Sequence, residues 1–149
     1  MKRILVLGAG FLQSFVIKRA RELGYYTIAI DRNPNATGFK DAHDYAVVDI
    51  VDQAACLGYA REKQIDGVMT AATDYGVLSA SFVAQELGLP GLNYEVARVI
   101  KDKFAVRRIL FANQVDEISQ FYEISSIDEL NDISEQVRFP VMDKPCDWS

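Results

Sequence analysis

The feature that most constrains the fold is a short apolar run that ends in a glycine pair and leads into a helical pattern. Residues 4–7 read Ile-Leu-Val-Leu, and Gly8-Ala9-Gly10 follows at once. A branched apolar run of this length, stopped by glycine, is typical of a buried strand. From Leu12, apolar residues then recur at helical spacing as far as Gly24. The chain therefore opens with a strand, a tight turn and a helix.

The same alternation continues to about residue 90. Further strands are expected over residues 27–30, 45–48 and 67–70, with helices over 52–63 and 74–87. Strands separated by helices of this length indicate right-handed crossovers and a parallel sheet covered on both faces. We therefore predict an α/β fold with a doubly wound, Rossmann-like parallel sheet.

The pattern changes after Pro90. Helices are expected over 94–100, 103–112 and after Ser126, and strands over 120–124 and 139–144. The last strand would begin a new sheet whose remaining strands are absent. We therefore predict one domain over residues 1–92, followed over 93–149 by helices and the truncated start of an α+β domain.

Composition excludes several classes of protein. The formal net charge of −5 and the scattered basic residues argue against nucleic-acid binding. No apolar stretch approaches the length of a membrane span, and the N-terminus lacks a targeting signal, so we expect a cytoplasmic protein. Two distant cysteines, Cys56 and Cys146, and one histidine, His43, form no metal-ligand cluster.

The glycine pair can either bind a ligand or only allow a tight turn. Gly8 and Gly10 place backbone N–H groups at a helix N-terminus, which can hold a phosphate or carboxylate. Asp31 ends the second strand, where a ribose-binding acid would lie, but Gln13 stands where the dinucleotide fingerprint has its third glycine. An NAD-binding interpretation is thus available and incomplete. The alternative is that the glycines only permit a tight strand-to-helix turn.

A second candidate pair follows the fourth strand. Thr73 and Asp74 come after residue 70, at the carboxyl edge where open α/β sheets bind ligands. Either side chain could instead cap the next helix, and capping does not exclude contact with a substrate.

Taken together, the motifs resemble the ATP-grasp superfamily, and more narrowly its carbamoyl-phosphate-synthase-like members. The resemblance covers the whole chain and depends on the order and spacing of its parts. The matching residues are Gly8-Ala9-Gly10, Asp31-Arg32-Asn33-Pro34, Asp66-Gly67-Val68, Thr73-Asp74, Gly88-Leu89-Pro90-Gly91, Asp102-Lys103 with Arg107, and Phe139-Pro140 with Lys144-Pro145.

The resemblance implies roles for these residues. The first domain, with Gly8, Gly10, Asp31, Thr73 and Asp74, would help to hold a small carboxylate acceptor. The lysines that match Lys103 and Lys144 would contact ATP. Two ammonium groups can neutralise phosphate charge while the γ-phosphoryl group moves to the carboxylate. A nitrogen nucleophile would then capture the acylphosphate.

Two departures from the family pattern matter. Asp143 stands where the family has an apolar residue, so it could pair with Lys144 or enter a core. The family's glycine-rich phosphate loop, adenine-binding hinge and magnesium-binding acids are not in this sequence. We therefore expect ATP and Mg²⁺ to serve the full-length parent, no catalytic residue here, no tightly bound ligand, and an inactive fragment.

Two other functions remain open: an NAD(P)-binding module of an oxidoreductase, and a non-catalytic ligand-binding domain. Self-association is also expected, because the apolar residues Phe139, Val141 and Met142 would form a sheet edge without partner strands.

Overall fold

The structure, a computed structural model, describes residues 1–115, 117 and 120–145. It divides into two compact units, Met1–Ala97 and Arg98–Ser149. The division falls inside helix α4 (Tyr94–Lys101), whereas the sequence suggested a boundary at residue 92. Cys146 lies outside the described residues.

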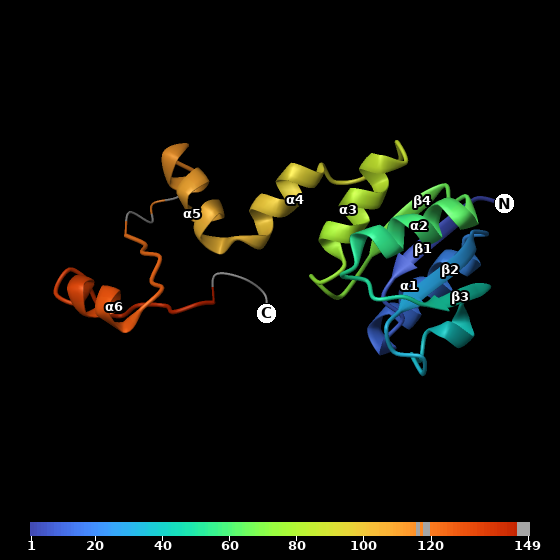
Figure 1. The fold of residues 1–149 in the computed structure, drawn as a ribbon, viewed down its shortest axis with the longest axis horizontal. Helices are drawn as coiled ribbons and strands as arrows, with labels where there is room; N and C mark the ends of the chain where they lie inside the picture. The colour runs from blue at the N-terminus through green and yellow to red at the C-terminus, as the bar shows by residue number, and fades with distance from the viewer. Residues whose placement is uncertain (116, 118–119, 146–149) are drawn as a thin grey trace. The chain divides into compact units, whose positions relative to one another are not determined.

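The first unit is built on a four-stranded parallel sheet, shown in Figure 1. Its strands are β1 (Arg3–Leu7), β2 (Tyr26–Asp31), β3 (Asp44–Val47) and β4 (Gly67–Thr70), in the order β3-β2-β1-β4. All four were predicted, and each pairing is parallel. The order reverses beside β1, so the loops after β1 and β4 begin next to each other, where Leu7 pairs with Thr70.

Helices connect the strands as the apolar spacing indicated. They are α1 (Phe11–Glu22), α2 (Gln53–Lys63) and α3 (Val77–Glu86). Asp52, at the start of the predicted helix, caps α2 by accepting a hydrogen bond from the Ala55 N–H at 2.9 Å. A short 3₁₀ helix, η1 (Phe39–Asp41), was not predicted from the sequence.

Alternate residues of the strands build two cores, one on each face of the sheet. Leu5 and Leu7 pack with Cys56 of α2 and Val83 of α3. Val6 packs on the opposite face, in a cluster that includes residues of α1 and η1. This division follows from the two-residue period of strand side chains. The predicted α/β class with helices on both faces of the sheet is confirmed.

The second unit contains α5 (Lys103–Ala112) and α6 (Ile127–Ile133). Helix α6 begins after its predicted cap, Ser126, and α5 begins at its predicted first residue, Lys103, after an Asp102 cap. Asp102 accepts from the N–H groups of the second and third residues of α5 at 2.9 Å. Ser126 accepts from Glu129 N–H at 3.2 Å, while the Glu129 carboxylate accepts from Ser125 N–H at 2.6 Å. These two hydrogen bonds resemble a capping box, except that Glu129 accepts from the residue before the N-cap and not from the N-cap itself.

The two strands predicted in this unit were wrong. No strand is assigned to residues 120–124 or 139–144, all of which the structure describes. A strand exists only with a hydrogen-bonded neighbour, and these segments have none among the described residues. Phe121 instead packs its ring edge-on against Phe104 and Phe111 of α5, with both centroid distances 5.7 Å.

Candidate ligand site at the carboxyl edge of the sheet

The glycine turn after β1 is held mainly by the protein itself. Gly8 has a φ of +97°, which favours glycine, and its N–H donates to the Ile30 carbonyl at 2.8 Å. The Ala9 N–H donates to Asp31 Oδ2 at 2.8 Å, and the Ala9 carbonyl accepts from Gly38 N–H at 2.6 Å. Donors for a ligand must therefore come from the first turn of α1, whose N–H groups have no partner within the helix.

Asp31 supports this turn with both carboxylate oxygens. Oδ2 accepts from Ala9 N–H, and Oδ1 accepts from Asn33 N–H at 2.9 Å. The position suggested a ribose-binding acid. These hydrogen bonds give Asp31 a structural role, because they join the ends of β1 and β2.

Gln13 is the residue whose contacts with the glycine turn the sequence analysis did not predict. It was noted only as a missing glycine, but its side chain is buried and its Nε2 donates to the Ala71 carbonyl at 2.7 Å. A Cβ atom placed on Gly10 would lie 2.9 Å from Gln13 Oε1, and one on Gly8 would lie 3.4 Å from its Cγ. The carboxamide therefore covers the glycine turn and reaches the loop after β4. The signal in the sequence is a glutamine at a position that faces the sheet.

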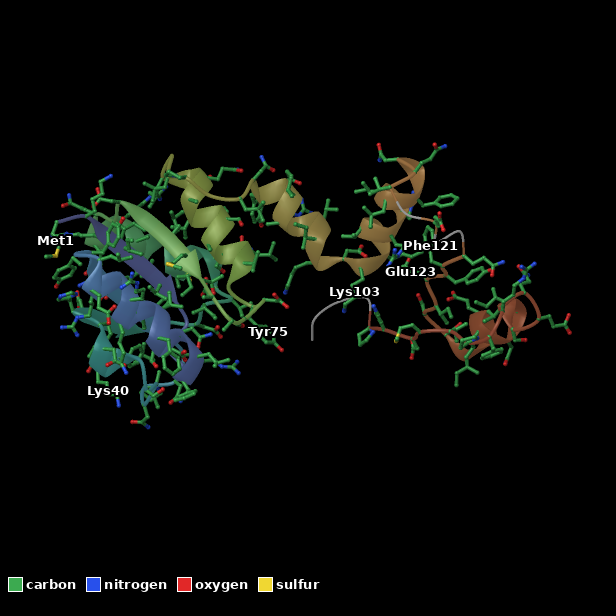
Figure 2. All side chains as sticks on the ribbon, turned by 180° about the vertical axis from the view of Figure 1, so that it is seen from behind. Met1, Lys40, Tyr75, Lys103, Phe121 and Glu123 are labelled. Carbon is green, nitrogen blue, oxygen red and sulfur yellow. The ribbon has the colours of Figure 1, made fainter. Side chains whose placement is uncertain are left out.

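The loop over residues 71–76 carries the second candidate pair. Ala72 has a φ of +55°, and Thr73 Oγ1 accepts from the N–H of Tyr75, which Figure 2 labels, at 3.3 Å. The Asp74 carbonyl, not its carboxylate, accepts from Val77 N–H. Capping by either side chain was wrong. Helix α3 begins three residues later than Asp74, and its N-cap is a glycine without a side-chain bond.

Thr73 and Asp74 therefore share one edge of the sheet with Gly8 and Gly10. The strand pairing of β1 with β4 and the Gln13 hydrogen bond bring their two loops together. This edge is where ligands bind in open α/β sheets.

The two lysines lie in the second unit. Lys103 is the first residue of α5, and its Nζ donates to the Pro145 carbonyl at 2.7 Å, so the chain beside Lys144 meets the start of α5. Figure 2 labels Lys103 at the start of this helix. Asp143 and Lys144 are both exposed, so the Asp143 carboxylate does not enter a core.

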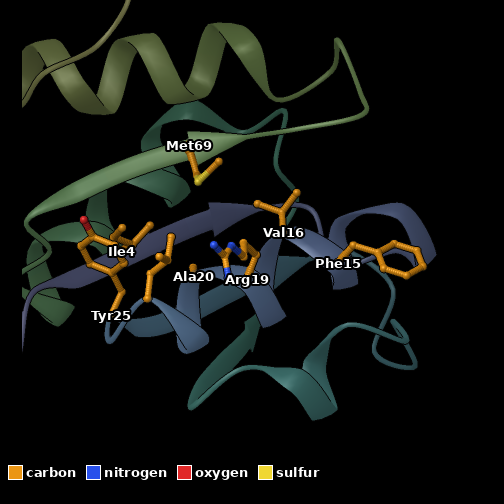
Figure 3. Close-up of a pocket in the computed structure, with 8 residues that line it drawn as sticks. Ile4, Phe15, Val16, Arg19, Ala20, Tyr25 and Met69 are labelled. Atoms are coloured by element: carbon orange, nitrogen blue, oxygen red, sulfur yellow. The ribbon is translucent and has the colours of Figure 1, made fainter.

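A shallow pocket of about 370 Å³ lies elsewhere, between α1 and the sheet (Figure 3). Its lining is almost wholly apolar and includes Ile4, Val16 and Met69, with Arg19 the only charged residue. A binding site for a polar reactant needs placed polar groups, so this pocket is not the candidate site.

Titration and metal geometry add no further site. Burial, with Asp52 nearby, raises the pKa of the Cys56 thiol to about 11, so it stays protonated near neutral pH and is a poor nucleophile. Among the described residues, no three His, Cys, Asp or Glu side chains are grouped to hold a metal ion. Within the same residues, no helix has the length and apolar character needed to cross a bilayer.

Three known proteins show what this chain is similar to. The formate-dependent phosphoribosylglycinamide formyltransferase of Paraburkholderia xenovorans is 27% identical over 148 residues, which are 96% of this chain and 36% of that protein. The crystal structure of phosphoribosylglycinamide synthetase from Anaerococcus prevotii matches 93% of the chain and 35% of its own, with a TM-score of 0.77 and 28% identity. An ADP complex of N5-carboxyaminoimidazole synthetase from Staphylococcus aureus has a TM-score of 0.71 at 14% identity, over 91% of this chain and 36% of its own, and shows the fold alone.

The relatives refine the resemblance. The chain spans 36% of the first of them, and the matched part is the N-terminal part. They are ATP-grasp enzymes, and their N-terminal domains have the Rossmann-like fold seen here. The narrower resemblance to carbamoyl-phosphate-synthase-like members has no support from them.

A family model also matches most of the chain. The model described as "NAD dependent epimerase/dehydratase family" matches residues 4–130, which include the glycine turn and Asp31. By this model the chain belongs to the NAD dependent epimerase/dehydratase family, and it is also similar to the N-terminal part of ATP-grasp enzymes.

Proposed function

We propose that this chain is the acceptor-binding and first ATP-contacting part of an ATP-dependent ligase. In this proposal, the sheet edge with Thr73 and Asp74 holds a small carboxylate acceptor. Lys103 and Lys144 contact the phosphates of ATP. The relatives along nearly the whole chain support the ATP-grasp part of this proposal.

The chemistry that fits is carboxylate activation. A carboxylate oxygen attacks the γ-phosphorus of ATP, the bond to the bridging oxygen breaks, and ADP leaves. A nitrogen nucleophile then attacks the acyl carbon, and phosphate leaves with the former carboxylate oxygen. Lysine side chains favour the first step because they offset the charge on the phosphate oxygens. Since the described residues offer no metal-ligand group, no step is assigned to Mg²⁺ in this chain.

One observation carries the nucleotide part of the proposal. The hydrogen bond from Lys103 Nζ to the Pro145 carbonyl joins two segments 42 residues apart in the sequence. It brings the residue beside Lys144 to the start of α5. A contact that brings the backbone beside Lys144 to Lys103 suits two lysines that act on one triphosphate.

The test is protection of lysines from an amine-reactive ester, read by mass spectrometry of the full chain. We expect millimolar ATP to lower the labelling of Lys103 and Lys144 several-fold. AMP, which lacks the β- and γ-phosphates, should protect neither. Lys40, an exposed residue of the first unit (Figure 2), should label equally throughout.

Matched variants sharpen this experiment. Lys103→Ala should abolish the protection of Lys144 by ATP, whereas Lys101→Ala, a neighbouring lysine at the end of α4, should leave it intact. Equal labelling of Lys103 with and without ATP would contradict the proposal.

The family model favours a second candidate function, an NAD-binding module. Gly8, Gly10 and Asp31 occupy the fingerprint positions for it. Against it stand the hydrogen bonds that occupy Asp31 and the Gln13 side chain over the turn. Saturable binding of NADH by the unaltered chain would favour this function over the ligase.

Self-association belongs to the same proposal. Phe139 and Met142 are 80% and 79% exposed, and an apolar segment so open to water favours association. Sedimentation equilibrium should show a dimer that dissociates when both residues are changed to serine. A monomer at all concentrations would contradict this.

A further inference from the structure

In this chain the space beside the glycine turn is filled by the side chain of Gln13. In a dinucleotide site, the second glycine is bare so that its backbone can approach the pyrophosphate. Here that glycine is Gly10, and Gln13 Oε1 lies 2.9 Å from the place of its missing Cβ. The Gln13 carboxamide therefore occupies the space beside the bare face of Gly10.

The orientation of this carboxamide follows from its partner. The Ala71 carbonyl can only accept a hydrogen bond, so the NH₂ end of Gln13 must face it, at 2.7 Å. The carbonyl end consequently points at Gly10. A carboxamide oxygen carries partial negative charge, so it opposes a phosphate at this position by charge as well as by volume.

The same side chain fixes the loop that follows β4. The hydrogen bond spans 58 residues of sequence and is made by a side chain that is only 8% exposed. The next residue, Ala72, has a φ of +55°, a conformation that a residue with a side chain keeps only when its surroundings hold it. Thr73 and Asp74 follow directly.

We propose that Gln13 is a specificity-determining residue, which closes the glycine turn to dinucleotides and holds the loop of residues 71–76 beside it. This inference rests on the proposed function only in taking Thr73 and Asp74 as acceptor contacts. Gln13 acts on them as a positioning residue. Gln13 thereby prevents NAD from binding at the Rossmann-like turn. It also holds the loop of residues 71–76 in a conformation that suits a smaller acceptor.

The experiment uses the full chain and three variants. Gln13→Gly restores the three-glycine fingerprint and removes the tether. Gln13→Leu removes the tether but still fills the space. Gln85→Leu makes the same chemical change at an exposed position of α3 and is the control. Each protein is titrated with NADH by calorimetry, and amide hydrogen exchange is followed in peptides covering β1 and residues 71–76.

We expect Gln13→Gly to bind NADH at least tenfold more tightly than the unaltered chain, with no gain for the leucine variant. Exchange over residues 71–76 should rise about tenfold in both Gln13 variants and stay unchanged in Gln85→Leu. Protection of the β1 peptide from exchange shows that each variant is folded. Tighter NADH binding by Gln13→Gly cannot result from loss of structure.

NADH binding by the unaltered chain as tight as by Gln13→Gly, or no gain in Gln13→Gly, would overturn the specificity role. Unchanged exchange over residues 71–76 in the leucine variant would overturn the tether. Neither measurement uses ATP or a carboxylate, so failure of the ligase proposal would leave these results unaffected.

Discussion

Gly10 and Gln13 should be energetically coupled, and a double-mutant cycle can measure the coupling. Gly10 has φ −68° and ψ −176°, a backbone conformation that alanine also adopts, so Gly10→Ala introduces no backbone strain. Its added Cβ would nevertheless lie 2.9 Å from Gln13 Oε1. The carboxamide must then move, and its hydrogen bond to the Ala71 carbonyl lengthens or breaks.

The magnitude follows from that hydrogen bond. Its loss costs about 0.5–1.5 kcal/mol, or about 1–3 kcal/mol if a buried partner is left unsatisfied. The lower entropy of the unfolded alanine chain stabilises by roughly 0.4–1 kcal/mol, and the N-cap preference for glycine over alanine opposes this. Both of these effects act equally when Gln13 is already alanine. They therefore cancel from the cycle, and we expect a coupling free energy of about 1–2 kcal/mol.

The assay is urea unfolding followed by far-UV circular dichroism, for the unaltered chain, Gly10→Ala, Gln13→Ala and the double variant. Gly58→Ala on α2 is the matched control, because its Cβ would meet nothing within 4 Å. It should stabilise the helix by roughly 0.5–1 kcal/mol in either background. A coupling between positions 10 and 13 below about 0.5 kcal/mol would refute the packing argument, since independent sites are additive to that level.

Three further outcomes are expected. Because burial raises the pKa of Cys56 from 9.0 to about 11, the folded state holds the thiol proton more tightly. The associated stability is full below pH 9 and falls as the pH rises towards 11, which urea unfolding at stepped pH should show for the unaltered chain and not for Cys56→Ala. Asp52→Ala should cost about 0.5–2 kcal/mol by removing the cap of α2, whereas Glu62→Ala, exposed on the same helix, should change the stability by no more than about 0.5 kcal/mol in the same assay. Gly76→Ala should lower the unfolding free energy by about 1–3 kcal/mol, because its Cβ would lie 2.6 Å from Thr70 Oγ1, and an unchanged urea midpoint would contradict this.

Much of the fold could be predicted because the signals are local. The apolar run of β1 and the spacing of α1 specify strand and helix within a few residues of sequence. The caps Asp52, Asp102 and Ser126 act on N–H groups two or three residues ahead, so their positions fixed three helix starts. Helix α3 starts later than predicted, because the loop before it is held by a hydrogen bond from Gln13.

The strand predictions failed where a partner was required. Residues 120–124 have a suitable apolar pattern, but a β-strand is a property of two segments, and the sequence pattern describes only one. Phe121 packed on α5 instead. The expected edge over residues 139–144 failed for the same reason.

The sequence by itself determined which segments fold into the sheet and which turns carry glycine, since these depend on side-chain periodicity and on φ. Only the tertiary structure decided what the candidate site residues contact. The roles of Asp31, Gln13 and Lys103 depend on the atoms of Ala9, Ala71 and Pro145, which lie 22, 58 and 42 residues away. A hydrogen bond acts over about 3 Å of space whatever the separation along the chain, so no local pattern could have specified these partners.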